Sequence, residues 1–190
     1  MTELSVLIPT VGTRPAMLDK VTAAITEQLP DAEIITRVSK SWGEGLNEMI
    51  PQAAGEYLSC CCDDTVPVPG WFEAGRAMLD SGVMPASRYW NVDGSPVHPV
   101  DEMPHGEQLG WCRSFLLTPD IYELVGPFID ATWYADWDYS ERLVAKGIPI
   151  LACDGFSFIH LDGIREWMTP EEDIRQRREY EASHARQGIA

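Results

Sequence analysis

Three consecutive cysteines, Cys60 to Cys62, are followed directly by two acids, Asp63 and Asp64. Thiolates are common ligands of zinc, so one interpretation of this stretch is a thiolate metal site. The other is a buried strand that ends in two carboxylates and presents them at an exposed edge. Carboxylate oxygens suit Mg²⁺ or Mn²⁺ bound together with phosphates. The two interpretations lead to different chemistry, and the spacing of the cysteines distinguishes them.

The spacing favours the strand. Side chains alternate between the two faces of a strand, so Cys60 and Cys62 point one way and Cys61 the other. Three adjacent cysteines therefore cannot converge on one tetrahedral zinc, and Cys112 and Cys153 stand alone in the sequence. We predict that the three cysteines pack in the core as small hydrophobes. Five cysteines without a C-x-x-C pair also indicate a reducing compartment.

Two other places carry residues that can do chemistry. Asp136 and Asp138 flank Trp137 near the start of an expected helix, where the helix dipole also favours acids. His160 ends an apolar segment, where a histidine is also common as a hydrogen-bonded core residue. A carboxylate can take a proton from a reacting hydroxyl, and an imidazole can bind a metal. From the residues alone, the structural and the chemical interpretations both stay open.

The first half of the chain alternates expected strands with expected helices. Strands are expected over residues 4–8, 32–38 and 56–62, and helices over 16–29, 43–55 (interrupted at Pro51) and 69–82. This alternation predicts an α/β fold with a mostly parallel central sheet flanked by helices. In such folds ligands bind outside the carboxyl ends of the strands, where Asp63 and Asp64 are expected to lie.

The second half of the chain is less regular. Extended segments are expected over 84–97 and 148–163, a strand with a short helix over 114–126, and helices over 135–147 and 169–188. We expect one catalytic-type domain over residues 1–165. The C-terminal helix, within 166–190, is expected to pack on this domain or extend from it.

Size and charge limit the possible functions. A chain of 190 residues with 45% hydrophobic content suits one domain with a real core. The 14 basic residues against 30 acids, a net charge of −16, argue against a surface that binds duplex nucleic acid. No apolar run approaches the roughly 20 residues of a membrane span. The first residues resemble no export signal, so a cytoplasmic location is expected.

Five fragments occur in a characteristic order: LSVLIPTVGTRP, GLNEMIPQAAGEYLSCCCDDTVPVPGWFE, LVGPFID, ADWDYSERLVAKGIPI and FIHLDG. Together they resemble family-2 glycosyltransferases of the GT-A fold, in particular the short bacterial or phage type. The resemblance covers roughly residues 4 to 163. It implies a hexosyl- or pentosyltransferase that moves a sugar, with inversion, from a nucleotide-sugar to an acceptor hydroxyl. Mn²⁺ or Mg²⁺ is the implied cofactor.

The resemblance also implies roles for individual acids. Asp63 and Asp64 match the DxD-type motif, in which the first acid contacts the nucleotide-sugar and the second binds the metal. His160 matches a late histidine that completes the metal site in many members. Asp136 matches the catalytic base, although the acid that usually precedes it is here Ala135.

Further residues are candidates for binding the two substrates. By the resemblance, the donor site includes Pro9, Thr10 and Arg14 in the first loop, and Asn47 in the helix before the metal strand. Aromatic faces stack on sugar rings, but they also fill cores. On this basis we place Trp111 and Trp133 on the acceptor side, with Gly110 beside Trp111 to permit close approach of the sugar. Asp138 is assigned to the same side, where it is expected to cap the helix or support the site.

Two other functions remain as alternatives. A nucleotidyltransferase of related fold would need a Gly-rich basic first loop, and PTVGTRP has one glycine and one arginine. A non-catalytic module that binds a nucleotide-sugar would keep the fold without turnover. In the family an acid contacts the nucleobase about where Ser39 or Lys40 stands here, so the base is open. The sugar, the acceptor (glycan, protein or small molecule) and the oligomeric state are open as well.

Overall fold

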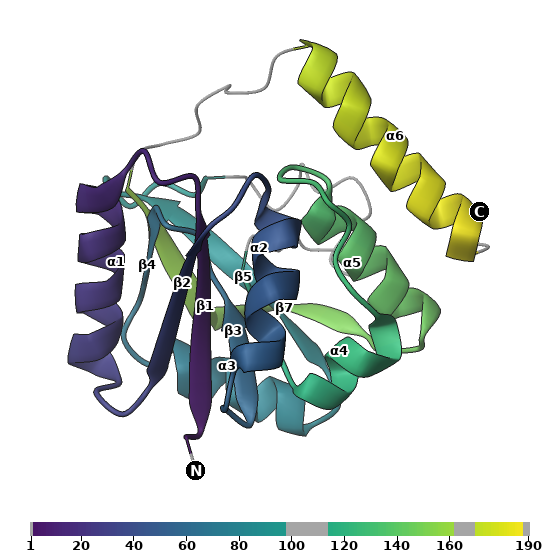
Figure 1. Ribbon diagram of the computed structural model, residues 1–190. Helices are drawn as coiled ribbons and strands as arrows, with labels where there is room; N and C mark the ends of the chain where they lie inside the picture. Colours follow the sequence, from purple (N-terminus) through teal and green to yellow (C-terminus); the bar gives the residue numbers. More distant parts are fainter. Residues whose placement is uncertain (1, 98–113, 162–169, 188–190) are drawn as a thin grey trace.

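The computed structural model describes residues 2–97, 114–161 and 170–187 (Figure 1). Strands alternate with helices along its first half, as predicted. The first half contains β1 (Leu4–Thr10), α1 (Pro15–Gln28), β2 (Glu33–Val38), α2 (Trp42–Met49), the short 3₁₀ helix η1 (Ile50–Gln52), β3 (Tyr57–Cys60), β4 (Thr65–Pro67) and α3 (Trp71–Asp80). The second half contains β5 (Met84–Asn91), β6 (Phe115–Leu117), α4 (Pro119–Val125), α5 (Ala135–Ala145), β7 (Ile150–His160) and α6 (Pro170–Gln187).

The central sheet has the strand order β2-β1-β3-β6. The strand β1 pairs in parallel with both β2 and β3, whereas β6 runs antiparallel to β3. All seven residues of β1 are buried, which fits a central strand covered on both faces. The helix α2 contacts β1 and β2 and lies in front of the sheet in Figure 1. The predicted α/β fold with a mostly parallel central sheet is thus confirmed.

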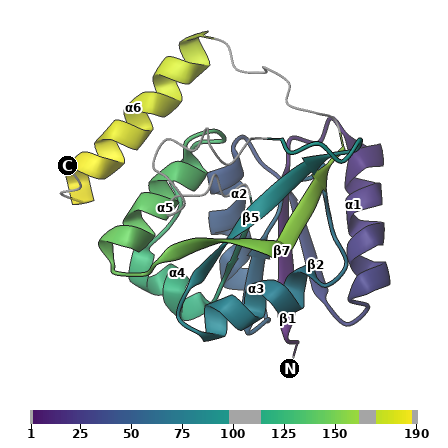
Figure 2. The ribbon, with the colours of Figure 1, turned by 180° about the vertical axis from the view of Figure 1, so that it is seen from behind.

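A second, three-stranded sheet has the order β4-β7-β5. Its long strand β7 pairs antiparallel with β4. It also pairs in parallel with β5, and these two strands lie side by side in Figure 2. The helix α3 contacts β5, β6 and β7 and so packs against strands of both sheets. The sequence analysis expected no strand at β4, because three residues between Asp64 and Val68 show no readable period. This short strand decides where the last residue of β7 lies.

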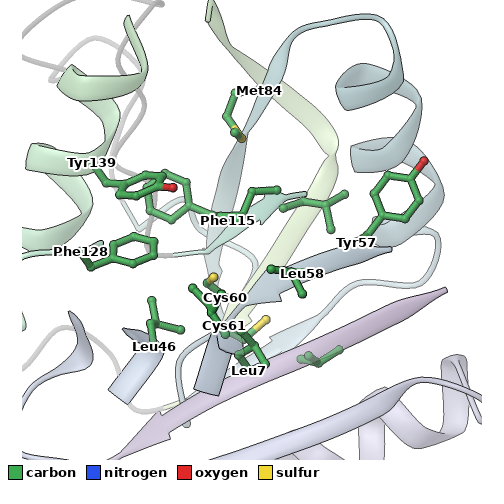
Figure 3. Packing of buried hydrophobic residues seen from close by; sticks show 14 of the residues in the cluster. Leu7, Leu46, Tyr57, Leu58, Cys60, Cys61, Met84, Phe115, Phe128 and Tyr139 are labelled. Atoms are coloured by element: carbon green, nitrogen blue, oxygen red, sulfur yellow. The ribbon is translucent and has the colours of Figure 1, made fainter. Parts of the chain in front are cut away.

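The cysteines lie in the core, as predicted. The side chains of Cys60 and Cys61 are fully buried and, in Figure 3, lie among Leu7, Leu46 and Leu58. Burial raises the pKa of the Cys60 thiol well above its ordinary value and that of Cys61 to about 11.

The remaining cysteines give no further evidence for a thiolate metal site. Cys62 is half-buried against the same core, and Cys112 lies outside the described residues. Within the described ranges, no group of three or more His, Cys, Asp or Glu side chains could hold a metal ion. The buried positions of Cys60 and Cys61 agree with the strand interpretation, and the absence of zinc stays a prediction.

The helix α6 lies alongside α5 (Figures 1 and 2). Its contacts include two hydrogen bonds: the Tyr134 hydroxyl donates to Asp173 at 2.7 Å, and the Tyr180 hydroxyl donates to Glu141 at 2.9 Å. The rings of Tyr134 and Tyr180 also lie in contact. The predicted domain boundary at residue 165 falls outside the described residues and stays a prediction. Among the helices that the structure describes, none is long and apolar enough to cross a membrane.

Candidate active site

A cluster of charged side chains lies where β1 and β3 end. Thr10 is the last residue of β1, and its hydroxyl donates to Asp63 Oδ2 at 2.5 Å. Arg14, just before α1, donates from Nη2 to Asp63 Oδ1 at 2.5 Å and from Nη1 to Asp64 Oδ2 at 2.7 Å. Three predicted donor-site residues, Thr10, Arg14 and Asp63, and the predicted metal ligand Asp64 are thus in direct contact at the expected edge of the sheet.

His160 joins this cluster through strand pairing. Thr65 of β4 pairs with His160 of β7, and the Leu161 amide donates to the Asp64 carbonyl at 2.9 Å. The pairing brings His160 Nε2 to 3.7 Å from Asp64 Oδ2. The imidazole is buried, with 5% of its side chain exposed, so its position is determined by packing as well as by the strand.

Burial and neighbouring charges shift the pKa values of Asp63 and Arg14. Burial raises the pKa of Asp63 and outweighs the opposing effects of the Thr10 hydrogen bond and of Arg14. Burial also lowers the pKa of Arg14, but the attraction and hydrogen bond of Asp64, together with Asp63, outweigh it and leave that pKa raised. Arg14 is therefore a permanent cation between two carboxylates.

Asp64 and His160 are the candidate ligands of a divalent ion. Metal–ligand bonds of about 2 Å place neighbouring donor atoms of an octahedral ion about 3 Å apart. The observed separation of 3.7 Å is close to this value. A carboxylate oxygen and an imidazole nitrogen also suit Mn²⁺. Two donors form part of a coordination sphere, so the pair fits an ion that takes its other ligands from phosphate and water.

Asp136 lies in the first turn of α5, with 7% of its surface exposed. Its Oδ1 accepts a hydrogen bond from the Trp137 amide at 3.0 Å. Figure 1 shows the start of α5 at the same, upper end of the molecule as the end of β1. This placement is compatible with the predicted role of Asp136 as base, which stays a prediction.

Asp138 does not line the acceptor side, contrary to the expectation from the sequence. Its carboxylate is fully buried and accepts from Arg142 Nε at 2.8 Å. Arg142 is equally buried and donates in addition to the Val125 carbonyl at 2.9 Å. The pair ties α5 to the end of α4. Two residues apart on a helix, Asp136 and Asp138 point in different directions, and only Asp138 points into the core.

Asn47 has a structural role. Its side-chain amide donates to the Phe128 carbonyl at 2.8 Å, and its side-chain oxygen accepts from the Phe128 amide at 2.9 Å and the Tyr122 hydroxyl at 3.0 Å. These bonds fix the segment that leads into α5. A donor contact of Asn47 stays a prediction, as does one of Pro9, which is buried within β1.

The acceptor side is described only in part. Trp133 is half-buried just before α5, and its amide donates to Gln176 Oε1 at 2.8 Å. Gly110 and Trp111 lie outside the described residues. Their assignment to the acceptor side stays a prediction.

Two residues at the start of α2, Ser41 and Gly43, were not selected in the sequence analysis. They connect α2 to the segment that leads into α5. The Ser41 hydroxyl donates to Asp130 at 2.5 Å, and the Gly43 amide donates to the Ala131 carbonyl at 3.0 Å. A side chain at Gly43 would place its Cβ 1.9 Å from the Ile129 carbonyl oxygen, so only glycine allows this approach. Ser41 also accepts from the Glu44 amide, an N-cap pattern readable from sequence, but its long-range partner is not.

A second overlooked residue is Gln176 of α6. Its side chain is buried, and Oε1 accepts hydrogen bonds from the amides of both Thr132 and Trp133. The helix α5 has no side-chain N-cap of its own, so Gln176 supplies the acceptor for the residues just before it. Nothing in the local sequence around Gln176 distinguishes it from other polar residues of α6.

The fold resembles that of a solved glycosyltransferase. Among solved structures, the chain is similar to the mannosyltransferase PcManGT from Pyrobaculum calidifontis in complex with GDP-Man and Mn²⁺, with a TM-score of 0.67 at 12% sequence identity. The similarity covers 97% of this chain, which spans 64% of the length of PcManGT. No protein-family model matches the chain, and no curated protein matches it. A glycosyltransferase-type fold is therefore confirmed, and membership of family 2 stays a prediction.

Proposed function

We propose that the protein is an inverting glycosyltransferase that uses a nucleotide-sugar and a divalent metal ion. The observation that carries the proposal is the contact between Asp64, His160 and Arg14 at the carboxyl ends of the strands. Two metal-type donors and a guanidinium converge there on one small region. This combination suits a diphosphate, because phosphate oxygens bind divalent metal ions and also accept hydrogen bonds from arginine.

Residues of the charged cluster bind the nucleotide-sugar donor. Asp64 and His160 would hold the ion, and a bound ion would neutralise negative charge on the departing diphosphate. Thr10 and Arg14 orient the carboxylate of Asp63. In this orientation Asp63 accepts hydrogen bonds from donor hydroxyl groups that approach the edge of the sheet.

Residues of α5 and of the segment before it bind and activate the acceptor. The acceptor oxygen attacks the anomeric carbon from the face opposite the diphosphate, a new C–O bond forms, and the bond from carbon to the diphosphate oxygen breaks. Asp136 accepts the proton that the acceptor hydroxyl loses. Trp133, together with Gly110 and Trp111, is proposed to contact the acceptor.

The structural neighbour suggests the first donor to test. PcManGT is described with GDP-Man and Mn²⁺, so GDP-mannose heads a panel of nucleotide-sugars for this chain. The acceptor is a hydroxyl of a glycan, a protein or a small molecule. We further propose residues 1–165 as the catalytic domain and a cytoplasmic location.

Release of nucleoside diphosphate tests the proposal. Purified protein is incubated with each donor in the presence of Mn²⁺, Mg²⁺ or EDTA, and the diphosphate released is measured with and without a mixture of candidate acceptors. We expect release with one donor class, in metal only, and loss of release in Asp136→Asn. Donor binding without release in any mixture would favour the non-catalytic module, and absence of binding to every donor would contradict the proposal.

A further inference from the structure

Arg14 donates a hydrogen bond to the same Asp64 oxygen that a metal ion would bind. Its Nη1 lies 2.7 Å from Asp64 Oδ2, and this same oxygen is the one 3.7 Å from His160 Nε2. The other nitrogen of the guanidinium, Nη2, donates to Asp63 Oδ1 at 2.5 Å. The side chain of Arg14 is 19% exposed, and those of Asp63 and Asp64 are 3% and 13% exposed. One cation therefore already bridges both acids in a partly buried site.

A guanidinium and a divalent ion compete for the same carboxylate oxygen. Both are cations, and when both lie beside Asp64 their mutual repulsion is only weakly screened, because the groups are partly buried. Resting on the proposed function, we propose that Arg14 is a resident counter-cation that blocks the metal site until a diphosphate arrives. Arg14 then exchanges its Nη1 contact with Asp64 for a diphosphate oxygen, and Asp64 becomes available to the ion.

The geometry supports an exchange of one contact rather than a full displacement. Asp63 is held independently by the Thr10 hydroxyl at 2.5 Å, so it keeps its place and its bond to Arg14 Nη2 when Nη1 moves. A phosphate group offers the planar guanidinium fork acceptors equivalent to those of a carboxylate. The ion and the diphosphate therefore bind cooperatively, each improving the affinity of the other by the same factor. Metal alone binds weakly because Arg14 keeps its contact with Asp64, and diphosphate alone binds weakly because the exchange leaves Asp64 without a counter-cation.

Calorimetric titration of Mn²⁺ alone tests the competition directly, without turnover. The variants are Arg14→Gln, which removes the charge, and Arg14→Lys, which keeps the charge but not the two-pronged fork. Arg37→Gln is the matched control, because Arg37 forms a carboxylate pair with Glu48 at 2.5 Å on the exposed surface. The control removes the same charge away from the site. Thermal unfolding of each variant shows that it is folded before titration.

We expect Mn²⁺ alone to bind Arg14→Gln about tenfold more tightly than wild type, because hydrogen bonds between charged groups contribute roughly this factor. Arg14→Lys and Arg37→Gln should stay near wild type. If Arg14→Gln does not fold, Arg14→Gln combined with Asp63→Asn replaces it with the same expectation, since this pair removes the guanidinium together with one acid and leaves Asp64 without a counter-cation. An unchanged or weaker Mn²⁺ affinity in the charge-removing variant would overturn the inference.

The second arm measures the coupling. GDP and UDP are titrated into each protein in Mn²⁺ and in EDTA, and the ratio of the two affinities is compared. We expect a large ratio in wild type and a ratio closer to one in Arg14→Gln. A diphosphate that binds wild type as tightly in EDTA as in Mn²⁺ overturns the inference. If neither diphosphate binds wild type even with Mn²⁺, the proposed function fails as well. Diphosphate binding combined with unchanged Mn²⁺ affinity in Arg14→Gln contradicts the inference alone.

Discussion

The imidazole of His160 lies 3.7 Å from the carboxylate of Asp64, because His160, the last residue of β7, pairs with Thr65 of β4, the residue that follows the two acids. We expect Asp64→Asn to lower the affinity for Mn²⁺ with GDP or UDP by about 100-fold, since loss of a residue that merely orients a metal ligand costs about 10–100-fold. His160→Gln should cost about tenfold. Calorimetry in Mn²⁺ measures both. Equal affinity of Asp64→Asn and wild type would contradict the metal role.

The two acids of α5 should behave differently when the carboxylate is replaced by an amide. Asp136→Asn keeps the shape of the side chain but removes its basicity, so sugar transfer should fall by about 10²–10⁴-fold. Affinity for the metal and diphosphate should remain near wild type. Single-turnover transfer and calorimetry measure the two quantities. Full activity of Asp136→Asn would move the role of base to another residue.

Asp138→Asn should instead lower stability. The buried pair of Asp138 and Arg142 leaves an uncompensated guanidinium when the carboxylate is lost, which costs about 3–5 kcal/mol. Urea unfolding measures the change in the free energy of unfolding. Asp138→Leu combined with Arg142→Met is the matched control and should recover most of the loss, because it removes both charges. A neutral effect of the single substitution would show that the pair is not a structural tie.

Gln176 should position the segment before α5. Gln176→Leu leaves the amides of Thr132 and Trp133 without this acceptor, so we expect a loss of about 2 kcal/mol of stability and slower transfer at unchanged donor affinity. Gln176 also donates to Glu172 at 2.8 Å. The combined change Gln176→Glu and Glu172→Gln keeps an acceptor for both amides and exchanges donor with acceptor in the second contact. This pair should rescue both losses, and failure to rescue would exclude the positioning role.

Tyr57 should give stability that is lost at alkaline pH. Its hydroxyl donates to Asp80 at 2.6 Å, and this hydrogen bond, with burial, raises the pKa of Tyr57 to about 12. The folded protein therefore holds the phenolic proton more tightly than the unfolded chain, whose tyrosine pKa is about 10. The contribution is complete below pH 10 and falls as the pH rises from about 10 to 12. Denaturant unfolding of wild type and Tyr57→Phe should show a stability difference that shrinks over this range, and a constant difference would contradict the assignment.

The local pattern of the sequence determined most of the elements. The apolar run from Leu4 to Ile8 predicted β1, and the apolar spacing of 16–29 predicted α1, because strand and helix periods are visible within a few residues. The same reasoning placed Cys60 and Cys61 in the core, and Asp63 and Asp64 beyond a strand end. These conclusions depend only on residues close together in the chain. They do not require knowledge of which distant residues come into contact.

Only the tertiary structure decided which distant residues meet. The three-residue strand β4 has no readable period, yet its pairing with β7 brings His160 to Asp64. Asp136 and Asp138 look alike in sequence, but packing of Arg142 from the next turn against α4 buries one of them completely. Arg14 reads as an ordinary loop cation until the fold sets it between two acids. Periodicity reports which face of an element is buried, whereas contacts between elements depend on strand pairing and helix packing across the whole chain.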